Sequence, residues 1–193
     1  HEKYRLKSIQ FTGNTNFSAR KLKKELKDTK ERKWWSFWVK SLDEKTFDED
    51  KKELATFYQN EGYRDFQVVS DTLMVDRENF SLTLVLSLKE GEQYHYRNIT
   101  FEGNEIADES TLKQLLKIEK GDVYSEKDFT KSVYEDMMSV YQDKGYIFSS
   151  VNPEIIPSGL DSLDINFVFN EGSKVYIENI FVSGNNKTRE NVI

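Results

Sequence analysis

Side chains that usually carry out acid–base or nucleophilic catalysis are scarce in this chain. Among its 193 residues the only histidines are His1 and His95, and cysteine is absent. A serine triad or a histidine metal site therefore has almost no residues to draw on, and zinc–thiolate sites are excluded. The glycines occur singly, so the chain has no glycine-rich phosphate loop. We therefore expect no enzyme, no bound cofactor and no metal site.

Carboxylates are numerous, but their distribution is typical of solvated surfaces. Asp and Glu total 34 against 28 Lys and Arg, which gives a net charge of −6. They are spread along the expected helices, and no pair stands out as a general acid and base, although such a pair stays an open alternative. A domain dedicated to nucleic acid is usually basic, so this balance predicts no nucleic-acid partner.

A cluster of aromatic residues beside a basic helix is the first candidate for binding. Exposed tryptophans next to basic residues suit a protein partner, a membrane surface or a nucleic acid. The alternative is that two of the tryptophans close the core of their own domain and that the basic face is only solvated. The aromatic cluster comprises Trp34, Trp35, Phe37 and Trp38, and the basic residues are Arg20, Lys21, Lys23, Lys24 and Lys27.

The elements that position these residues come from an internal repeat. Three landmarks recur in the same order: a strand ending in Gly-Asn, a helix ending in Gly-Tyr, and a strand ending in Glu-Gly. Recurrence in one order is the signature of tandem modules. The landmarks lie at 6–14, 96–104 and 177–185, at 57–63 and 140–146, and at 88–91 and 169–172.

Each copy is predicted to run strand, helix, helix, strand, strand. Ser18 is the expected N-cap of the first helix, and Thr46-x-x-Glu49 and Ser125-x-x-Asp128 resemble capping boxes for the second. Every second residue of the last strands is a large apolar one over 80–88 and 163–169, which predicts a sheet covered on one side. The expected fold class is α+β, with tandem βααββ modules that each contain a three-stranded mixed sheet and two helices on one face.

The landmarks also divide the chain. Residues 1–92 are the first complete module, with an insertion at 28–42, and residues 93–173 are the second. Residues 174–193 are expected to start a third module that is truncated. Because almost no linker separates the copies, we expect a semi-rigid rod.

Several of these motifs resemble one known family, the polypeptide-transport-associated (POTRA) domain. The likeness rests on the βααββ order and on the strand ending in Gly-Asn. The first copy, with its insertion, resembles the third of five such domains in assembly factors for outer-membrane β-barrel proteins, and the second copy resembles the fourth. The matching motifs are Trp34-Trp35, Phe57-Tyr58-x-x-x-Gly62-Tyr63 and Glu90-Gly91-x-x-Tyr94.

The resemblance implies a periplasmic scaffold in an outer-membrane β-barrel assembly machine. It implies that the modules lie on the periplasmic side of a bacterial outer membrane. It also implies three kinds of partner: unfolded outer-membrane β-barrel proteins, accessory assembly lipoproteins, and a C-terminal membrane barrel outside this chain.

The same resemblance implies that the last strand of each sheet lies in the middle and that residues 64–75 form an edge strand. An edge offers unpaired N–H and C=O groups to which an extended peptide can add as a further strand. The second copy carries Pro153 and Pro157 in the corresponding strand, and proline removes donors, so we expect strand addition in the first copy. The expected peptide-binding residues are Phe66, Gln67, Val68, Val69 and Ser70.

Three alternatives remain at this point. The edge strand could be an ordinary solvated edge. The chain could instead contact a membrane surface or lipid through the basic helix and residues 34–38. It could also be the POTRA region of a related secretion transporter.

Overall fold

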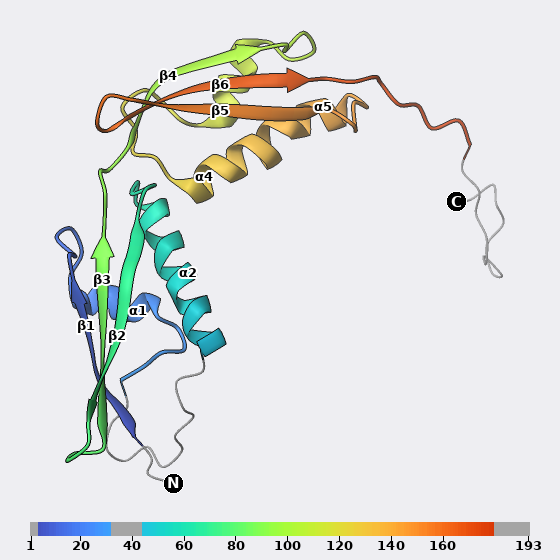
Figure 1. Ribbon diagram of the computed structural model, residues 1–193. Coiled ribbons are helices and arrows are strands. Elements are labelled where there is room, and N and C mark those ends of the chain that lie inside the picture. The colour runs from blue at the N-terminus through green and yellow to red at the C-terminus, as the bar shows by residue number, and fades with distance from the viewer. Residues whose placement is uncertain (1–3, 32–43, 180–193) are drawn as a thin grey trace, which may run out of the picture.

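The computed structural model describes residues 4–31 and 44–179, and these form two modules with the same order of elements (Figure 1). This order confirms the expected α+β class. The first module contains β1 (Arg5–Thr12), α1 (Ala19–Glu25), α2 (Glu44–Asn60), β2 (Gln67–Asp76) and β3 (Ser81–Lys89). The second contains β4 (His95–Glu102), α3 (Glu109–Leu116), α4 (Glu126–Lys131), the π-helical segment η1 (Ser132–Met137), α5 (Met138–Asp143), β5 (Ser150–Ser158) and β6 (Ser162–Asn170).

Both sheets are mixed and have their last strand in the middle. The order is β1-β3-β2 in the first module and β4-β6-β5 in the second. The central strand is parallel to the first strand of its module and antiparallel to the other. The expected strand order is therefore confirmed, and β2 and β5 each lie at an edge.

The core of the first module lies between the sheet and its two helices. Leu84 and Leu86 lie on one face of β3 and are almost fully buried against Leu22 of α1 and Leu54 of α2. Burying each such side chain contributes about 1.5–3 kcal/mol relative to leaving it exposed. The opposite face of β3 carries Thr83, Val85 and Ser87, which are half-buried, and no helix of the described residues covers it, so each module has one layer of helix and one of sheet.

The structure confirms two of the three N-caps that the sequence predicted. Ser18 and Ser125 are N-caps, and their hydroxyls accept hydrogen bonds from Lys21 N at 3.3 Å and Asp128 N at 3.4 Å. The expectation for Thr46 is wrong, because α2 is already helical at Glu44. Glu and Lys are better helix formers than Thr, so the helix extends past the residue that looked like its cap.

The π-helical segment in the second module was not expected from the sequence. A π turn accommodates an extra residue within a helix. Here it keeps both Val133 and Met137 fully buried in the core. Within the described residues, no helix is sufficiently long and apolar to span a bilayer.

A buried carboxylate ties the end of β3 to the loop after β1. Glu90 is 5% exposed and accepts hydrogen bonds from the Thr15 backbone N at 2.9 Å, the Asn16 backbone N at 3.0 Å and the Tyr58 hydroxyl at 2.7 Å. Burial alone would raise the pKa of Glu90, but the hydrogen bonds from Thr15, Tyr58 and Asn16 outweigh it and hold this pKa below its usual value. The charged carboxylate is therefore part of the folded first module.

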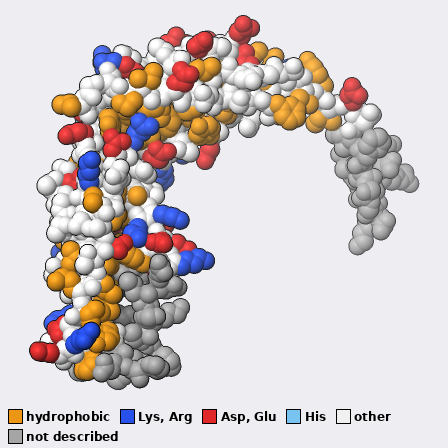
Figure 2. All heavy atoms as spheres, viewed as in Figure 1, with side chains coloured by type: hydrophobic (Ala, Val, Ile, Leu, Met, Phe, Trp, Pro, Cys, Tyr) orange, Lys and Arg blue, Asp and Glu red, His pale blue; other side chains and the backbone are white. Residues whose placement is uncertain are grey.

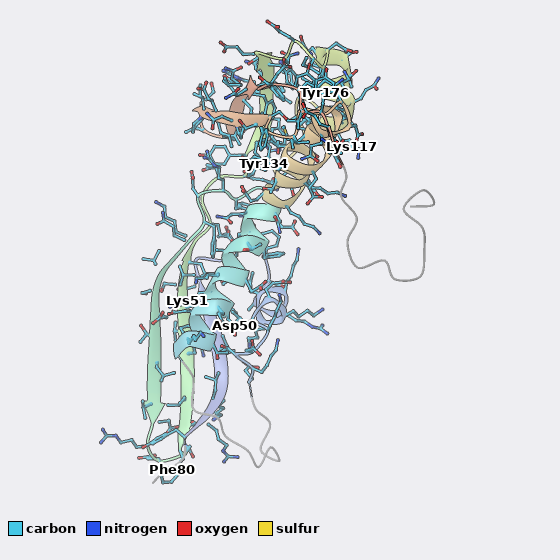
Figure 3. All side chains as sticks on the ribbon, turned by 90° about the vertical axis from the view of Figure 1, so that its right-hand side faces the viewer. Asp50, Lys51, Phe80, Lys117, Tyr134 and Tyr176 are labelled. Carbon is cyan, nitrogen blue, oxygen red and sulfur yellow. The ribbon has the colours of Figure 1, made fainter. Side chains whose placement is uncertain are left out.

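Direct contacts join the two modules. The Gly62 carbonyl accepts a hydrogen bond from Tyr94 N at 2.9 Å, and the Asn60 side chain at the end of α2 accepts one from Lys127 N in the first turn of α4 at 2.9 Å. The Tyr94 hydroxyl also donates to Asp65 at 2.7 Å. Figures 1 and 3 show the end of α2 lying directly below the start of α4. These contacts support the expected semi-rigid connection.

We expect Glu90→Gln to lower the stability of the first module and to change its pH dependence. The folded-state pKa of Glu90 lies below the unfolded value of 4.5, so the carboxylate stabilises the fold above about pH 4.5. This contribution is lost as the pH falls through the folded-state pKa. At pH 7 the substitution should cost about 1–3 kcal/mol, measured by amide exchange in residues 4–91.

Glu171→Gln in the second module is the matched control. Glu171 accepts a hydrogen bond from Ile106 N at 2.8 Å. We expect a smaller loss of stability, because fewer backbone and side-chain donors surround this carboxylate than surround Glu90. Equal losses from the two substitutions would contradict the anchoring role of Glu90.

We expect Gly62→Ala to change the orientation of the two modules. Gly62 has φ +94, and a Cβ there would lie 2.7 Å from Cγ1 of Val123 in the next module. Gly121→Ala is the control, since Gly121 has φ +95 but nothing lies within 4 Å of a Cβ. Both changes introduce backbone strain, but only Gly62→Ala should shift residual dipolar couplings of one module relative to the other. Unchanged couplings would show that Gly62 does not set the joint.

Candidate functional site

The outer edge of β2 is the candidate site. β2 pairs on its inner side with β3, and among the described residues no strand pairs with its outer side. A free edge presents a row of unpaired backbone donors and acceptors.

The five residues expected to bind peptide lie at the start of this edge, and the structure separates them. Phe66 precedes β2, is 6% exposed and stacks on Tyr58 with ring centroids 3.9 Å apart. Its side chain is therefore part of the core, and Val68 packs partly against the same core. Gln67, Val69 and Ser70 are exposed.

A β-bulge interrupts the edge at Val69. Val68 lies opposite Leu88 and Ser70 lies opposite Ser87, so Val69 is an extra residue on β2, and its exposed fraction is 64%. A bulge leaves one residue outside the regular ladder and bends the strand. The regular part of the edge therefore runs from Ser70 to Asp76, mostly beyond the five residues that the sequence indicated.

Apolar side chains are exposed along this regular part. Leu73, Met74 and Val75 have exposed fractions of 41%, 58% and 53%. Asp71, by contrast, is held by Lys51 of α2 at 3.0 Å, and Asp48 and Asp71 raise the pKa of Lys51. Figure 3 shows Lys51 on α2 and Phe80 at the far end of the β2–β3 hairpin. Residues 73–75 form a continuous apolar run in the sequence, and their exposure is a property of the folded module.

The opposite edge of the first sheet is partly closed by a side chain. Ile9 N on β1 donates to the Glu31 carboxylate at 2.8 Å, and Glu31 is paired with Lys23 at 2.6 Å. Burial would raise the pKa of Glu31, but the bonds from Lys23 and Ile9 outweigh it and lower this pKa. A further strand on β1 would have to displace this carboxylate.

Both edges of the second sheet are also less available. Pro153 and Pro157 lie in β5 opposite Phe167 and Leu163. Proline is tolerated in an edge strand when its nitrogen faces away from the ladder, so each one removes a donor from the free side. At the other edge, Tyr96 N of β4 donates to the carbonyl of Asp122 at 3.0 Å, and residues 121–124 cover the start of the strand.

The basic residues near α1 are largely paired within their own module. Three of them form ion pairs with acidic residues, and the Lys21 ammonium also lies 4.5 Å from the ring centroid of Phe17. Exposed ion pairs are weak, but they reduce the positive field available to an anionic surface. The pairs are Lys21–Glu61 at 3.3 Å, Lys23–Glu31 at 2.6 Å and Lys27–Glu53 at 2.8 Å.

The aromatic cluster of Trp34, Trp35, Phe37 and Trp38 falls outside the described residues, and its role stays a prediction.

Within residues 4–31 and 44–179, no group of three or more His, Asp or Glu side chains is arranged to hold a metal ion. His95 lies at the start of β4, opposite Val123.

Relatives of this chain are known from sequence. It is 27% identical over 194 residues to the outer membrane protein assembly factor BamA of Neisseria meningitidis, which covers 98% of this chain and 24% of the relative. It is 31% identical over 197 residues to BamA of Neorickettsia risticii, covering 97% of this chain and 25% of the relative. The chain thus spans about a quarter of the length of these relatives.

Solved structures show the same fold. A crystal structure of Haemophilus influenzae BamA POTRA3-5 matches with a TM-score of 0.65 and 19% identity, over 98% of this chain and 74% of that one. BamA of Haemophilus ducreyi lacking POTRA domains 1-3 matches with a TM-score of 0.64 and 16% identity, over 88% of this chain and 30% of that one.

The family model described as "POTRA: Surface antigen variable number repeat" matches residues 4–91 and 94–172. Because this model covers both copies of the repeat, the chain belongs to the POTRA family.

Proposed function

We propose that this chain is a polypeptide-binding scaffold in a machine that assembles outer-membrane β-barrel proteins. Membership of the POTRA family and similarity to BamA support this role and give a location on the periplasmic side of the outer membrane. The observation that carries the proposal is the free, regular edge of β2 from Ser70 to Asp76.

In this proposal an unfolded client adds one extended segment to β2. Its backbone pairs with the free N–H and C=O groups of the edge, so recognition depends little on side-chain identity and suits many clients. Each backbone hydrogen bond contributes about 0.5–1.5 kcal/mol net, whereas fixing one residue of a flexible peptide costs about 1–2 kcal/mol. Binding at one edge is therefore weak, and several modules acting together hold a client.

The proposed partners extend beyond the client. Accessory lipoproteins would dock on the modules, and a C-terminal membrane barrel outside this chain would receive the client. The similarity to BamA supports both proposals. A scaffold needs no catalytic group, in keeping with the scarcity of histidine and the absence of cysteine.

Contact with a membrane surface is the weaker proposal. Lys21, Lys23 and Lys27 are paired with acids of the first module, which reduces the charge of the basic helix that could attract anionic lipid. Salt-sensitive flotation with anionic vesicles would favour this alternative. We expect no flotation above that of neutral vesicles.

We expect peptides from an outer-membrane β-strand to protect β2 from deuterium exchange. Protection should appear in residues 70–76, because each new backbone pair removes a free amide from solvent. A peptide of the same sequence with N-methylated central residues is the control, since it lacks the donors and should give no protection. Protection in residues 150–158 instead of 70–76 would contradict the proposal.

We further expect the double substitution Pro153→Val and Pro157→Val to create a second site. It restores two backbone donors on the free side of β5 and keeps a side chain suited to a strand. Peptide-induced protection should then appear in residues 150–158 of the variant and stay absent there in the unmodified chain. If the variant gains no protection, proline is not what excludes peptide from the second module.

A further inference from the structure

A buried carboxylate of α2 holds the segment that follows α1. Asp50 is 1% exposed and accepts hydrogen bonds from Asp28 N at 3.1 Å and from Thr29 N at 2.5 Å. Figure 3 shows Asp50 near the start of α2. A carboxylate is costly to bury unless polar groups bond to it, so the two amides and the carboxylate hold one another in place. Residues 28–29 are therefore fixed to the core of the first module.

The second module has an apolar side chain at the corresponding place. Asp50 lies twelve residues before Gly62, and Val133 lies twelve residues before Gly145. Val133 is fully buried among apolar side chains. A carboxylate is thus not needed at this position to complete the fold. What Asp50 adds in the first module is the attachment of the segment after α1.

The same segment reaches the outer side of β1 two residues later. One oxygen of the Glu31 carboxylate accepts hydrogen bonds from Ile9 N at 2.8 Å and from the Lys23 ammonium at 2.6 Å. Between the two anchors, the Lys30 side chain donates to the Leu26 carbonyl at the end of α1. We call residues 28–31 the strap, since one end is bound by Asp50 and the other lies on the edge of β1.

The two ends of the strap differ in accessibility. Asp50 is buried, whereas the side chains of Lys23 and Glu31 are 34% and 37% exposed. Figure 2 shows basic and acidic side chains beside one another on the surface of the first module. An exposed ion pair is weak because water competes for both partners. The Glu31 end can therefore detach while Asp50 still holds the other end.

The first strand of the second module is covered in another way. Tyr96 N donates to the Asp122 carbonyl at 3.0 Å, and Gly121 N donates to the Tyr96 carbonyl at 2.7 Å. These are bonds between two backbones, so β4 cannot be uncovered there without moving the loop. At Ile9 of β1 a single side chain makes the closure, and rotation of that side chain opens it.

We propose that the strap is a releasable cover over a second strand-addition site, on the outer side of β1, that takes an extended polypeptide segment. This inference rests on strand addition as the proposed mode of binding. Ile9 and Phe11 lie opposite Leu84 and Leu86 in regular register. Residues two apart on a strand turn their backbone groups to the same side, so Phe11 shares the outer side with Ile9.

The chemistry of this edge favours a polypeptide. The Ile9 amide with the Lys23 ammonium could bind any anion, but the outer carbonyls of β1 need donors. An extended segment supplies donors and acceptors in alternation. It competes with Glu31 for the Ile9 amide, so binding and release of the strap are coupled. The closed module would hold a client at β2 alone, and the open module at both edges of its sheet.

Two substitutions that release the strap test the proposal, with an outer-membrane β-strand peptide and deuterium exchange as the readout. In Glu31→Ala without peptide, the Ile9 amide should exchange roughly tenfold faster, because it loses a charged acceptor. With peptide, Ile9 and Phe11 should gain protection that they do not gain in the unmodified chain. Asp50→Val, which introduces the residue type found at Val133, should give the same gain because the strap loses its fixed end.

Two further variants are the controls. Glu31→Gln keeps an oxygen that accepts from Ile9 N, so the edge should stay shut. Glu25→Ala removes an equal charge from α1 but leaves the Ile9 amide bonded to Glu31, so the edge should also stay shut. Thermal unfolding of every variant shows whether the first module is folded.

The outcomes separate this inference from the proposed function. If peptide protects residues 70–76 in folded Glu31→Ala but Ile9 and Phe11 gain nothing, the strap proposal is overturned and the proposed function stands. If residues 70–76 are unprotected in every form, the proposed function fails, whereas protection of Ile9 and Phe11 in Glu31→Ala alone still supports the strap. Protection of these two amides in the unmodified chain would show an open edge and overturn the proposal. Protection that rises with the concentration of the variant, without peptide, would assign the edge to a second copy and overturn the peptide as its ligand.

Discussion

Placing the last strand in the middle of a three-stranded sheet creates two edges in every module, and this constraint shapes most of the structure. The free backbone groups of an edge have to be paired, covered or left to solvent. β1 is closed at Ile9 by the Glu31 carboxylate, the start of β4 is covered by residues 121–124, and β5 carries two prolines. Among residues 4–31 and 44–179, none of these devices lies on β2 beyond its bulge at Val69. Three of the four edges are thus closed or interrupted by different means. The lack of such a device on β2, among the described residues, marks it as the candidate site.

The two copies share one framework but differ in the chemistry that holds it. In both copies a glycine directly follows the first strand, and a Cβ at Gly13 or Gly103 would lie within 2.6 Å of a carbonyl oxygen of the central strand. In both, an Asn side chain closes the following loop: Asn14 donates to the Phe17 carbonyl at 2.8 Å and Asn104 to the Ala107 carbonyl at 2.9 Å. The buried Glu90 network supplements this framework in the first copy. In that copy the buried Asp50 of α2 also accepts a hydrogen bond from Thr29 N at 2.5 Å, within the segment 28–42 that was predicted to be an insertion.

The sequence predicted the order of the elements, because period-two alternation and recurring glycines are strong local signals, whereas the position of the central strand was implied by the resemblance to the POTRA family. It did not predict the bulge at Val69, since a bulge depends on how two strands pair and not on one of them. Phe66 was assigned to the edge because it adjoins β2, but its ring lies against Tyr58 in the core. The start of α2 was misjudged at Thr46, because Glu44 is already helical, and the exposure of Leu73 and Val75 is a property of the packed module and not of the strand's own sequence. The roles of Trp34, Trp35, Phe37 and Trp38 and the exact module boundaries stay predictions.

The joint at Gly62 has a consequence for folding. The Asn60 side chain at the last residue of α2 accepts a hydrogen bond from the Lys127 N–H in the first turn of α4, so the first module satisfies a backbone donor at the start of a helix of the second. In arrays of modules that touch only their neighbours, stability is the sum of the intrinsic stability of each unit and one interface term per joint. The second module should therefore fold more favourably when the first is already folded. The backbone hydrogen bond from Tyr94 N to the Gly62 carbonyl recurs in the second copy, where Val175 N donates to the Gly145 carbonyl at 2.9 Å. The same nearest-neighbour cooperativity would therefore pass on along the chain.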